Sequence, residues 1–449
     1  MRVSHVASSA IAIAFSLLAC GAPVPKGDGD GGHGDGQGPP DACVGLQCMQ
    51  VDCSTMGGGT TTLSGVVYAP NKTLPLYNVT VYVPNSDPGP LTAGATCDRC
   101  DNALPGNPVV QTTTDEMGHF VLENVPVVPN LPLVIQVGKW RRQITVATVA
   151  ACVDTPLDAT QTSLPSKASE GDMPQMAITT GGADALECLL PKLGIDPSEF
   201  STDSGTGHVH LYNGNGASKF ASGQPNTGTF SDAKTLWNNL DQLKKYDLVI
   251  FSCEGSQPSD TRAPASSQQA VFDYANLGGR VFMSHWHNKW LEVGPQEWPT
   301  VATFDNNSNN LDTTTGTIDE GFDRGRSFAT WMLNVGGSTT RDLIDIKDGR
   351  NTCQAVDGQK AQRWVYLDSS TSGGPVGVQN LQFTAPLSAP ESDRCGKVVF
   401  SDMHVSSGSS SSSGTGFPGG CATSGLTPQE KALAFMFFDI ASCVGPIVN

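Results

Sequence analysis

The chain has 449 residues, enough for about three domains of ordinary size. Charged residues make up 15% of it, below the roughly 25% of an average soluble domain, and its formal net charge is −17. Such an acidic chain lacks the basic surface that a phosphate backbone requires, which excludes nucleic acid as the main partner. A hydrophobic fraction of 38% likewise excludes a protein that crosses a membrane many times.

The first 19 residues have the pattern of an export signal. An apolar stretch over residues 7–19 is too short to span a bilayer as a helix, and a small residue precedes Cys20. The sequence LLAC at 17–20 resembles the lipobox of bacterial lipoproteins, in which the cysteine is acylated and becomes the first residue. We therefore expect a signal peptide over residues 1–19 and lipidation of Cys20. The alternative is ordinary secretion with a chance cysteine.

A polar, glycine-rich segment follows the expected acylation site. Residues 20–42 contain the run GDGDGGHGDGQGPP, which predicts a disordered tether. Gly21 stands where an Asp often marks retention in the inner membrane of enteric bacteria. We therefore expect an exported protein held by lipid in the outer membrane, on its periplasmic or surface face. The expected partners are that membrane and a glycan or another envelope protein.

The cysteines support the same compartment. Without Cys20, twelve of the thirteen remain, and an even number in an exported chain predicts disulfides, although spacing does not give their pairing. Cys97 and Cys100 form a lone C-x-x-C, for which we expect structural disulfide bonding rather than half of a zinc site. A cysteine-rich segment spans 43–59. The expected disulfide cysteines are Cys43, Cys48, Cys53, Cys97, Cys100, Cys152, Cys188, Cys253, Cys353, Cys395, Cys421 and Cys443.

Residues 60–151 have the pattern of a β-sandwich, because short alternating strands are separated by frequent proline and glycine. The segments GVVY at 65–68, NVTVYV at 78–83, TDEMGHFVL at 114–122 and NVP at 124–126 resemble the carboxypeptidase-regulatory-like (transthyretin-like) sandwich. That resemblance implies a seven-stranded accessory module of surface proteins, sometimes classed with carbohydrate-binding-like folds, and no catalysis.

A dense basic segment, KWRR at 139–142, lies within this module. We expect a solvated turn in which Trp140 packs on the sandwich. The alternative is a contact with an anion or with the other domain.

Residues 172–446, after a linker over 152–171, alternate between strands and helices. The expected strands are continuous apolar runs, which are typical of a parallel, doubly wound sheet covered on both faces. An insertion interrupts the pattern at about 296–390, with a helix and two strand-like segments of its own. The expected strands are 176–180, 208–212, 246–251, 280–283 and 396–400, and the expected helices are 184–193, 231–244, 265–277 and 427–441.

Three segments of this domain carry a second resemblance: YDLVIFS at 246–252, LGGRVFMSHWH at 277–287 and GKVVFSDMH at 396–404. They resemble the flavodoxin-like fold of class I glutamine amidotransferase-like proteins, within it the trehalose-utilisation (ThuA-like) branch. That family places a nucleophilic cysteine at the turn that here reads Ser284-His285, and an acid where this chain has Ser406. The glutaminase arrangement is therefore missing. The whole chain resembles exported lipoproteins of myxobacterial type that combine these two modules.

Ligands of an open α/β sheet bind beyond the carboxyl ends of its strands, and polar side chains gather there in this sequence. A strand-like His285-x-His287 would point both rings the same way, which suits a divalent metal such as Zn²⁺. Cys253 is expected in a disulfide rather than as a nucleophile. The histidines could instead be hydrogen-bonded groups of a non-catalytic pocket, or purely structural, as we expect of His208 and His210. The catalytic candidates are His285, His404, Asp402 and Glu254; the metal candidates are His285, His287, His404 and Asp402; the binding candidates are Asp184, Ser284 and Trp286.

Two functions remain open. The first is a binding or structural protein of the envelope, with carbohydrate as a candidate ligand, and the missing glutaminase arrangement favours it. The second is an exported metal-dependent hydrolase or sugar-processing enzyme that uses the His/Asp pocket.

Overall fold

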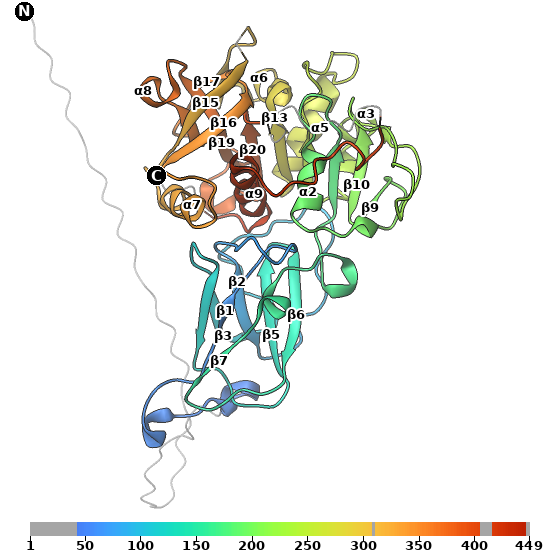
Figure 1. The fold of residues 1–449 in the computed structure, drawn as a ribbon. Coiled ribbons are helices and arrows are strands. Elements are labelled where there is room, and N and C mark those ends of the chain that lie inside the picture. Colours follow the sequence, from blue (N-terminus) through green and yellow to red (C-terminus); the bar gives the residue numbers. More distant parts are fainter. Residues whose placement is uncertain (1–42, 308–309, 405–414, 446–449) are drawn as a thin grey trace, which may run out of the picture. The chain divides into compact units, whose positions relative to one another are not determined.

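The structure is a computed structural model that describes residues 43–307, 310–404 and 415–445 (Figure 1). The expected signal peptide, Cys20 and the tether up to residue 42 lie outside this part. Contacts divide the chain into Met1–Cys43 and a compact unit over Val44–Asn449. Within the described residues, no helix combines the length and the apolar character that crossing a bilayer requires.

The amino-terminal part of the compact unit contains two sheets that share a core, as in a β-sandwich. Side chains alternate along its strands: Phe120 and Leu122 are buried, while their sequence neighbours are exposed. Valines of the facing sheet, Val81 and Val83 among them, belong to the same apolar cluster. One sheet has the order β4-β1-β7 (His119–Glu123, Thr62–Val66, Asp154–Pro156), and the other β3-β2-β5-β6 (Pro108–Thr113, Thr80–Pro84, Leu131–Val137, Trp140–Val146).

The second part of the unit contains a mixed sheet of eleven strands (Figure 1). Its central strands β10-β8-β12-β13-β20 are parallel, and all of them except β10 are fully buried, as the apolar runs predict. The insertion adds four antiparallel strands beyond β20, so the expected parallel strands form the centre of a larger, mixed sheet. The strands in spatial order are β11 (Ser231–Asp232), β10 (Val209–Asn213), β8 (Met176–Thr179), β12 (Leu248–Phe251), β13 (Arg280–Ser284), β20 (Gly396–Ser401), β19 (Gly377–Ala385), β18 (Gln362–Leu367), β15 (Leu311–Ile318) and β16 (Leu343–Gly349), with β9 (Phe200–Ser201) on β10.

Helices and one small sheet complete this part. Thr427 and Glu430 form the capping box that opens α9, whose apolar side chains pack against β13 and β20. The expected helix over 231–244 is broken at Asn238, and Asn239 caps its second half. The helices are α1 (Ala159–Thr162), α2 (Leu189–Lys192), α3 (Lys234–Trp237), α4 (Leu240–Leu243), α5 (Ala265–Asn276), α6 (Lys289–Glu292), α7 (Asp323–Asn334), α8 (Ser369–Ser372) and α9 (Pro428–Ala441), and β14 (Ala302–Phe304) pairs with β17 (Cys353–Val356).

Disulfides join segments that are far apart in the sequence. Neither cysteine of the C-x-x-C bonds to the other, because each bonds to a distant residue near the carboxyl end of the chain. Cys253 and Cys353 are buried and free, so the expectation that they form disulfides is wrong. The bonds are Cys53–Cys152, Cys97–Cys395, Cys100–Cys443 and Cys188–Cys421, and Cys43 and Cys48 are disulfide-bonded as well.

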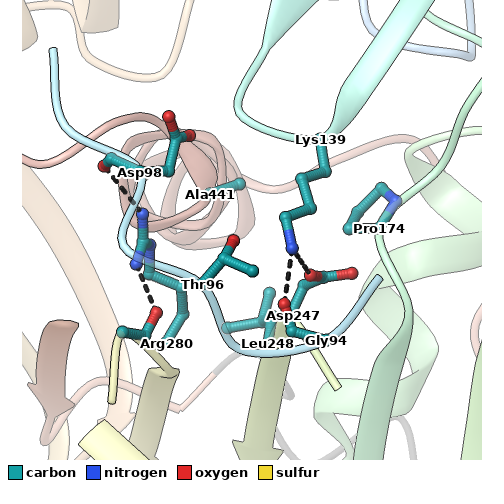
Figure 2. Close-up of a pocket in the computed structure, with 10 residues that line it drawn as sticks. Gly94, Thr96, Asp98, Lys139, Pro174, Asp247, Leu248, Arg280 and Ala441 are labelled. Atoms are coloured by element: carbon teal, nitrogen blue, oxygen red, sulfur yellow. Dashed lines mark hydrogen bonds and ion pairs between the residues drawn. The ribbon is translucent and has the colours of Figure 1, made fainter. Parts of the chain in front are cut away.

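The basic segment 139–142 is a contact between the sandwich and the α/β part, so the expectation of a solvated turn is wrong. Figure 2 shows Lys139 reaching Asp247, the residue before β12, where Nζ lies 2.5 Å from Oδ1. Trp140 is fully buried and its ring packs on Phe437 and Phe438 of α9. Beside it, Arg141 pairs with Asp172, the first residue of the α/β part, at 2.8 Å.

Candidate functional site

The carboxyl ends of three adjacent parallel strands bring three side chains together. Cys253 follows β12, His285 follows β13 and His404 follows β20, which are neighbours in the sheet. One potential ligand atom of each residue lies within 4.8 Å of those of the other two. Sγ of Cys253 is 3.4 Å from Nδ1 of His285, and all three residues are at most 1% exposed. The expected meeting of His285 and His404 is therefore found, with Cys253 as a third member.

The backbone at His285 sets this arrangement. Its φ is +38°, a left-handed conformation that is rare for residues other than glycine. Strained backbone of this kind is often found at functional sites. The preceding Ser284 donates a hydrogen bond from Oγ to Oδ2 of Asp184 at 2.6 Å, which ties the turn to the loop after β8. The ring of the half-buried Trp286 contacts the His285 ring at a tilt, with 4.4 Å between the ring centroids. The binding candidates Asp184, Ser284 and Trp286 thus support the turn that carries His285.

His287 points away from this group, so the expectation of two parallel imidazoles is wrong. The strand ends at Ser284, and residues 285–288 form a turn of 3₁₀-helix rather than an extended segment. The ring of His287 uses both nitrogens elsewhere: Nε2 donates to the Ser252 carbonyl at 3.0 Å, and Nδ1 accepts from the indole of Trp290 at 2.9 Å. A ring bonded in this way serves the structure rather than a metal.

Neither acidic candidate belongs to the cluster of Cys253, His285 and His404. Asp402 is fully buried, and its oxygens accept hydrogen bonds from Thr352 N, Thr352 Oγ1 and Cys353 N at 2.5–2.8 Å. Burial raises its pKa to about 6, although those hydrogen bonds act in the opposite direction. Glu254 lies 3.4 Å from the guanidinium of Arg262, and burial raises its pKa too. Asp402 therefore anchors the loop at 350–353.

With no metal bound, the side chains of Cys253, His285 and His404 carry no net charge. Burial lowers the pKa of His285 to about 2 and that of His404 to about 3, and the nearby guanidinium of Arg350 adds to both effects. Burial also raises the pKa of the Cys253 thiol to about 12. A thiol with that pKa is a poor nucleophile, because the thiolate is the reactive form. Arg350 could not be identified from the sequence as a neighbour of the cluster, because it lies in the insertion and no motif surrounds it.

His208 and His210 both contact neighbouring side chains through a ring nitrogen, which agrees with the structural role expected of them. Nδ1 of His208 lies 2.7 Å from Glu199 Oε2. In β10, His210 Nδ1 lies 2.9 Å from the hydroxyl of Tyr246. Neither ring belongs to the Cys253, His285 and His404 cluster, so both serve the structure at the other side of the sheet.

Replacing His210 by Gln is expected to make the fall in the free energy of unfolding on acidification less steep. Burial lowers the pKa of His210, and nearby Asp203 offsets only part of that effect. Below pH ~6.5 the unfolded chain therefore binds a proton that the native state refuses, so stability falls as pH falls. Urea unfolding at a series of pH values from ~7 to ~5 measures the slope. His119→Gln, at an exposed histidine of the sandwich, is the control that should keep the wild-type slope.

A larger cavity, of about 780 Å³, lies away from the strand ends. It opens between a loop of the sandwich at 71–75 and the segment that follows the Cys188–Cys421 disulfide. Small-molecule sites in proteins commonly enclose ~300–1,000 Å³. Its lining includes the exposed hydroxyl groups of Thr73, Thr423 and Ser424 and the ammonium groups of Lys192 and Lys431.

Comparison with known proteins yields little. No family model matches the chain, and no curated protein does. Among solved structures, two interface mutants of the type II cohesin–X-dockerin complex from Acetivibrio cellulolyticus match with 17% sequence identity. The matches cover 33% and 30% of this chain and 79% and 85% of those chains, with TM-scores of 0.16 and 0.17. At these scores the similarity carries no inference about fold, ligand or partner.

Proposed function

We propose that this chain is an exported lipoprotein, anchored through Cys20 in the outer membrane, that acts as a glycan-binding protein of the envelope. In this proposal the two sheets of residues 60–151 are the carboxypeptidase-regulatory-like module. The α/β part is a flavodoxin-like, amidotransferase-like domain of the ThuA-like branch that has lost the glutaminase reaction. The cavity of about 780 Å³ is the observation that carries the binding role.

The shape and chemistry of that cavity suit a sugar. Hydroxyl groups of Thr73, Thr423 and Ser424 can both donate and accept hydrogen bonds, as the hydroxyls of a glycan do. The cavity walls come from segments that other contacts hold in place. Cys188–Cys421 fixes one wall, and a salt bridge of 2.6 Å between Lys192 and Glu430 fixes another. A site whose walls are already ordered loses little conformational entropy when the ligand binds.

The strand-end cluster argues against glutaminase chemistry. The turn after β13 presents the imidazole of His285, and Cys253 on the next strand is a buried thiol whose pKa is raised. Thiolate chemistry at neutral pH requires a lowered pKa instead.

Glycan binding by the full-length chain tests the proposal. We expect one class of envelope glycan to bind on an array, and Thr423→Trp, which places a large ring in the cavity, to weaken that binding at least ~10-fold in titration calorimetry. Thr339→Trp is the matched control, because Thr339 is an exposed threonine outside the cavity lining. The proposal fails if no glycan binds or if both variants bind as the wild type does.

A metal-dependent hydrolase is the second candidate, and the cluster of Cys253, His285 and His404 favours it. It requires turnover of a glycoside or ester substrate by the full-length chain, with at least ~100-fold loss in His404→Gln. A panel of chromogenic glycosides and esters measures this. Turnover that survives the substitution would exclude the cluster as the active site.

A further inference from the structure

We propose that Cys253, His285 and His404 bind one Zn²⁺ ion. This site is independent of the glycan-binding proposal, since it lies at the strand ends and shares no residue with the cavity of about 780 Å³. The three ligands come from the ends of three neighbouring strands, so the parallel sheet itself holds them in place.

The distances suit a tetrahedral zinc ion. Zinc binds cysteine sulfur at ~2.3 Å and histidine nitrogen at ~2.0–2.1 Å, which at a tetrahedral angle places sulfur and nitrogen ~3.5 Å apart. Cys253 Sγ and His285 Nδ1 are 3.4 Å apart. The third ligand atom, on His404, lies within 4.8 Å of the other two, so a metal would draw it inward by up to roughly an ångström.

The two imidazoles have hydrogen-bonding capacity that the described residues leave unused. Nε2 of His404 is buried without a hydrogen-bond partner in that part of the chain, and a metal ion there would pair it. Nε2 of His285 is also unpaired, but a metal ion on Nδ1 of that ring would leave it so, and only His404 supports a metal in this way. Buried polar atoms of native proteins are nearly always paired, so an unpaired nitrogen calls for an explanation.

A backbone donor beside the sulfur would orient a metal-bound thiolate. The backbone N–H of Gly255 donates to Sγ at 3.4 Å. Hydrogen bonds of this kind orient a metal ligand and stabilise its negative charge. On binding, the Cys253 thiol releases its proton to solvent and zinc replaces it, leaving a net charge of about +1 on the ion and its three ligands.

The same argument explains why Cys253 remains a thiol while most other described cysteines are in disulfides. Cys353, the other free cysteine, belongs to no such cluster among the described residues, and its sulfur donates to the Ala355 carbonyl at 3.9 Å. One thiolate with two imidazoles is a ligand set that favours Zn²⁺ over Mg²⁺ or Ca²⁺, and three protein ligands leave a fourth position for water.

Metal analysis of the full-length chain tests the site. The chain is exported into an oxidising compartment, purified without a chelating resin, and its zinc is measured by mass spectrometry. We expect about one zinc per chain. Cys253→Ser and His404→Gln should lower it at least ~10-fold, whereas Cys353→Ser, at a buried free thiol outside the cluster, should keep it. Circular dichroism of each variant separates metal loss from misfolding.

Cobalt gives a second readout that does not depend on activity. Co²⁺ in the metal-stripped chain should produce a sulfur-to-cobalt absorption band in the wild type and Cys353→Ser, and none in folded Cys253→Ser. Three outcomes overturn the site: a chain that neither carries zinc nor takes it up from micromolar solution, stoichiometric copper in its place, or zinc retained in Cys253→Ser. Glycan binding should be unchanged in Cys253→Ser, so failure of either proposal leaves the other standing.

Discussion

Replacing Cys97, Cys100, Cys395 and Cys443 together by serine is expected to remove most of the stability of the chain. The two bonds close loops with sequence separations of 298 and 343 residues. Because Cys188–Cys421 remains in these variants, the first of the two bonds closes a loop of roughly 120 residues through it and restricts the unfolded chain by about 5 kcal/mol in the chain-entropy model. The second bond then closes a smaller loop, of roughly fifty residues, and adds about 4 kcal/mol. Together they equal the whole stability of many domains, about 5–15 kcal/mol.

Urea unfolding, followed by tryptophan fluorescence and circular dichroism, measures this loss. The controls are the two variants that lack one bond each, Cys97→Ser with Cys395→Ser and Cys100→Ser with Cys443→Ser. Each should lose about 4 kcal/mol, because the remaining bond still holds the long loop closed. A fourfold variant as stable as either control would show that the bonds do not act on the unfolded chain in this way.

Trp140→Ala should lower the free energy of unfolding by about 3–5 kcal/mol, as the loss of a large buried aromatic ring does elsewhere. Trp140 is fully buried, and its ring lies 5.6 Å from that of Phe438 and 6.0 Å from that of Phe437, both on α9. Its Nε1 donates to the carbonyl of Pro165 at 2.9 Å. The substitution therefore removes packing between the sandwich and the α/β part as well as one hydrogen bond.

Trp140→Phe separates these two contributions. Phenylalanine keeps most of the ring contact with α9 and loses the hydrogen bond to Pro165, for an expected cost of about 1–2 kcal/mol. Urea unfolding of both variants, with the wild type alongside, gives the comparison. Equal losses in the two variants would mean that the hydrogen bond, rather than the packing, holds this contact.

The sequence predicted best those features that depend on local pattern. The apolar run at 246–251 contains a buried parallel strand. The alternation around Phe120 marks β4, a strand of the sandwich, and Thr427 with Glu430 forms the predicted cap of α9. Each of these follows from neighbouring residues alone. The break at Asn238 and Asn239, which interrupts an otherwise amphipathic stretch, was a local signal that could have been used, because Asn is a good helix cap.

The missed features depend on contacts between distant residues. The C-x-x-C looks like a unit in the sequence, yet its partners lie roughly 300 residues away, and spacing carries no information on them. Strand β19 of the insertion pairs with β20, and the other antiparallel strands follow it in order, through tertiary contacts that no motif marks. At the site, the positive φ of His285 turns His287 away from the cluster, and a non-glycine residue gives no sign of such a conformation.

The disulfide map has a consequence for how the protein is made. Cys97, Cys100 and Cys188 bond to Cys395, Cys443 and Cys421, so none of these bonds can form until nearly the whole chain has been synthesised. A product that stops before residue 395 leaves Cys97, Cys100 and Cys188 without their native partners, however well its sandwich has folded. Only the finished chain can form these disulfides. A compartment that retains or degrades proteins with reactive thiols would therefore release complete copies and remove truncated ones.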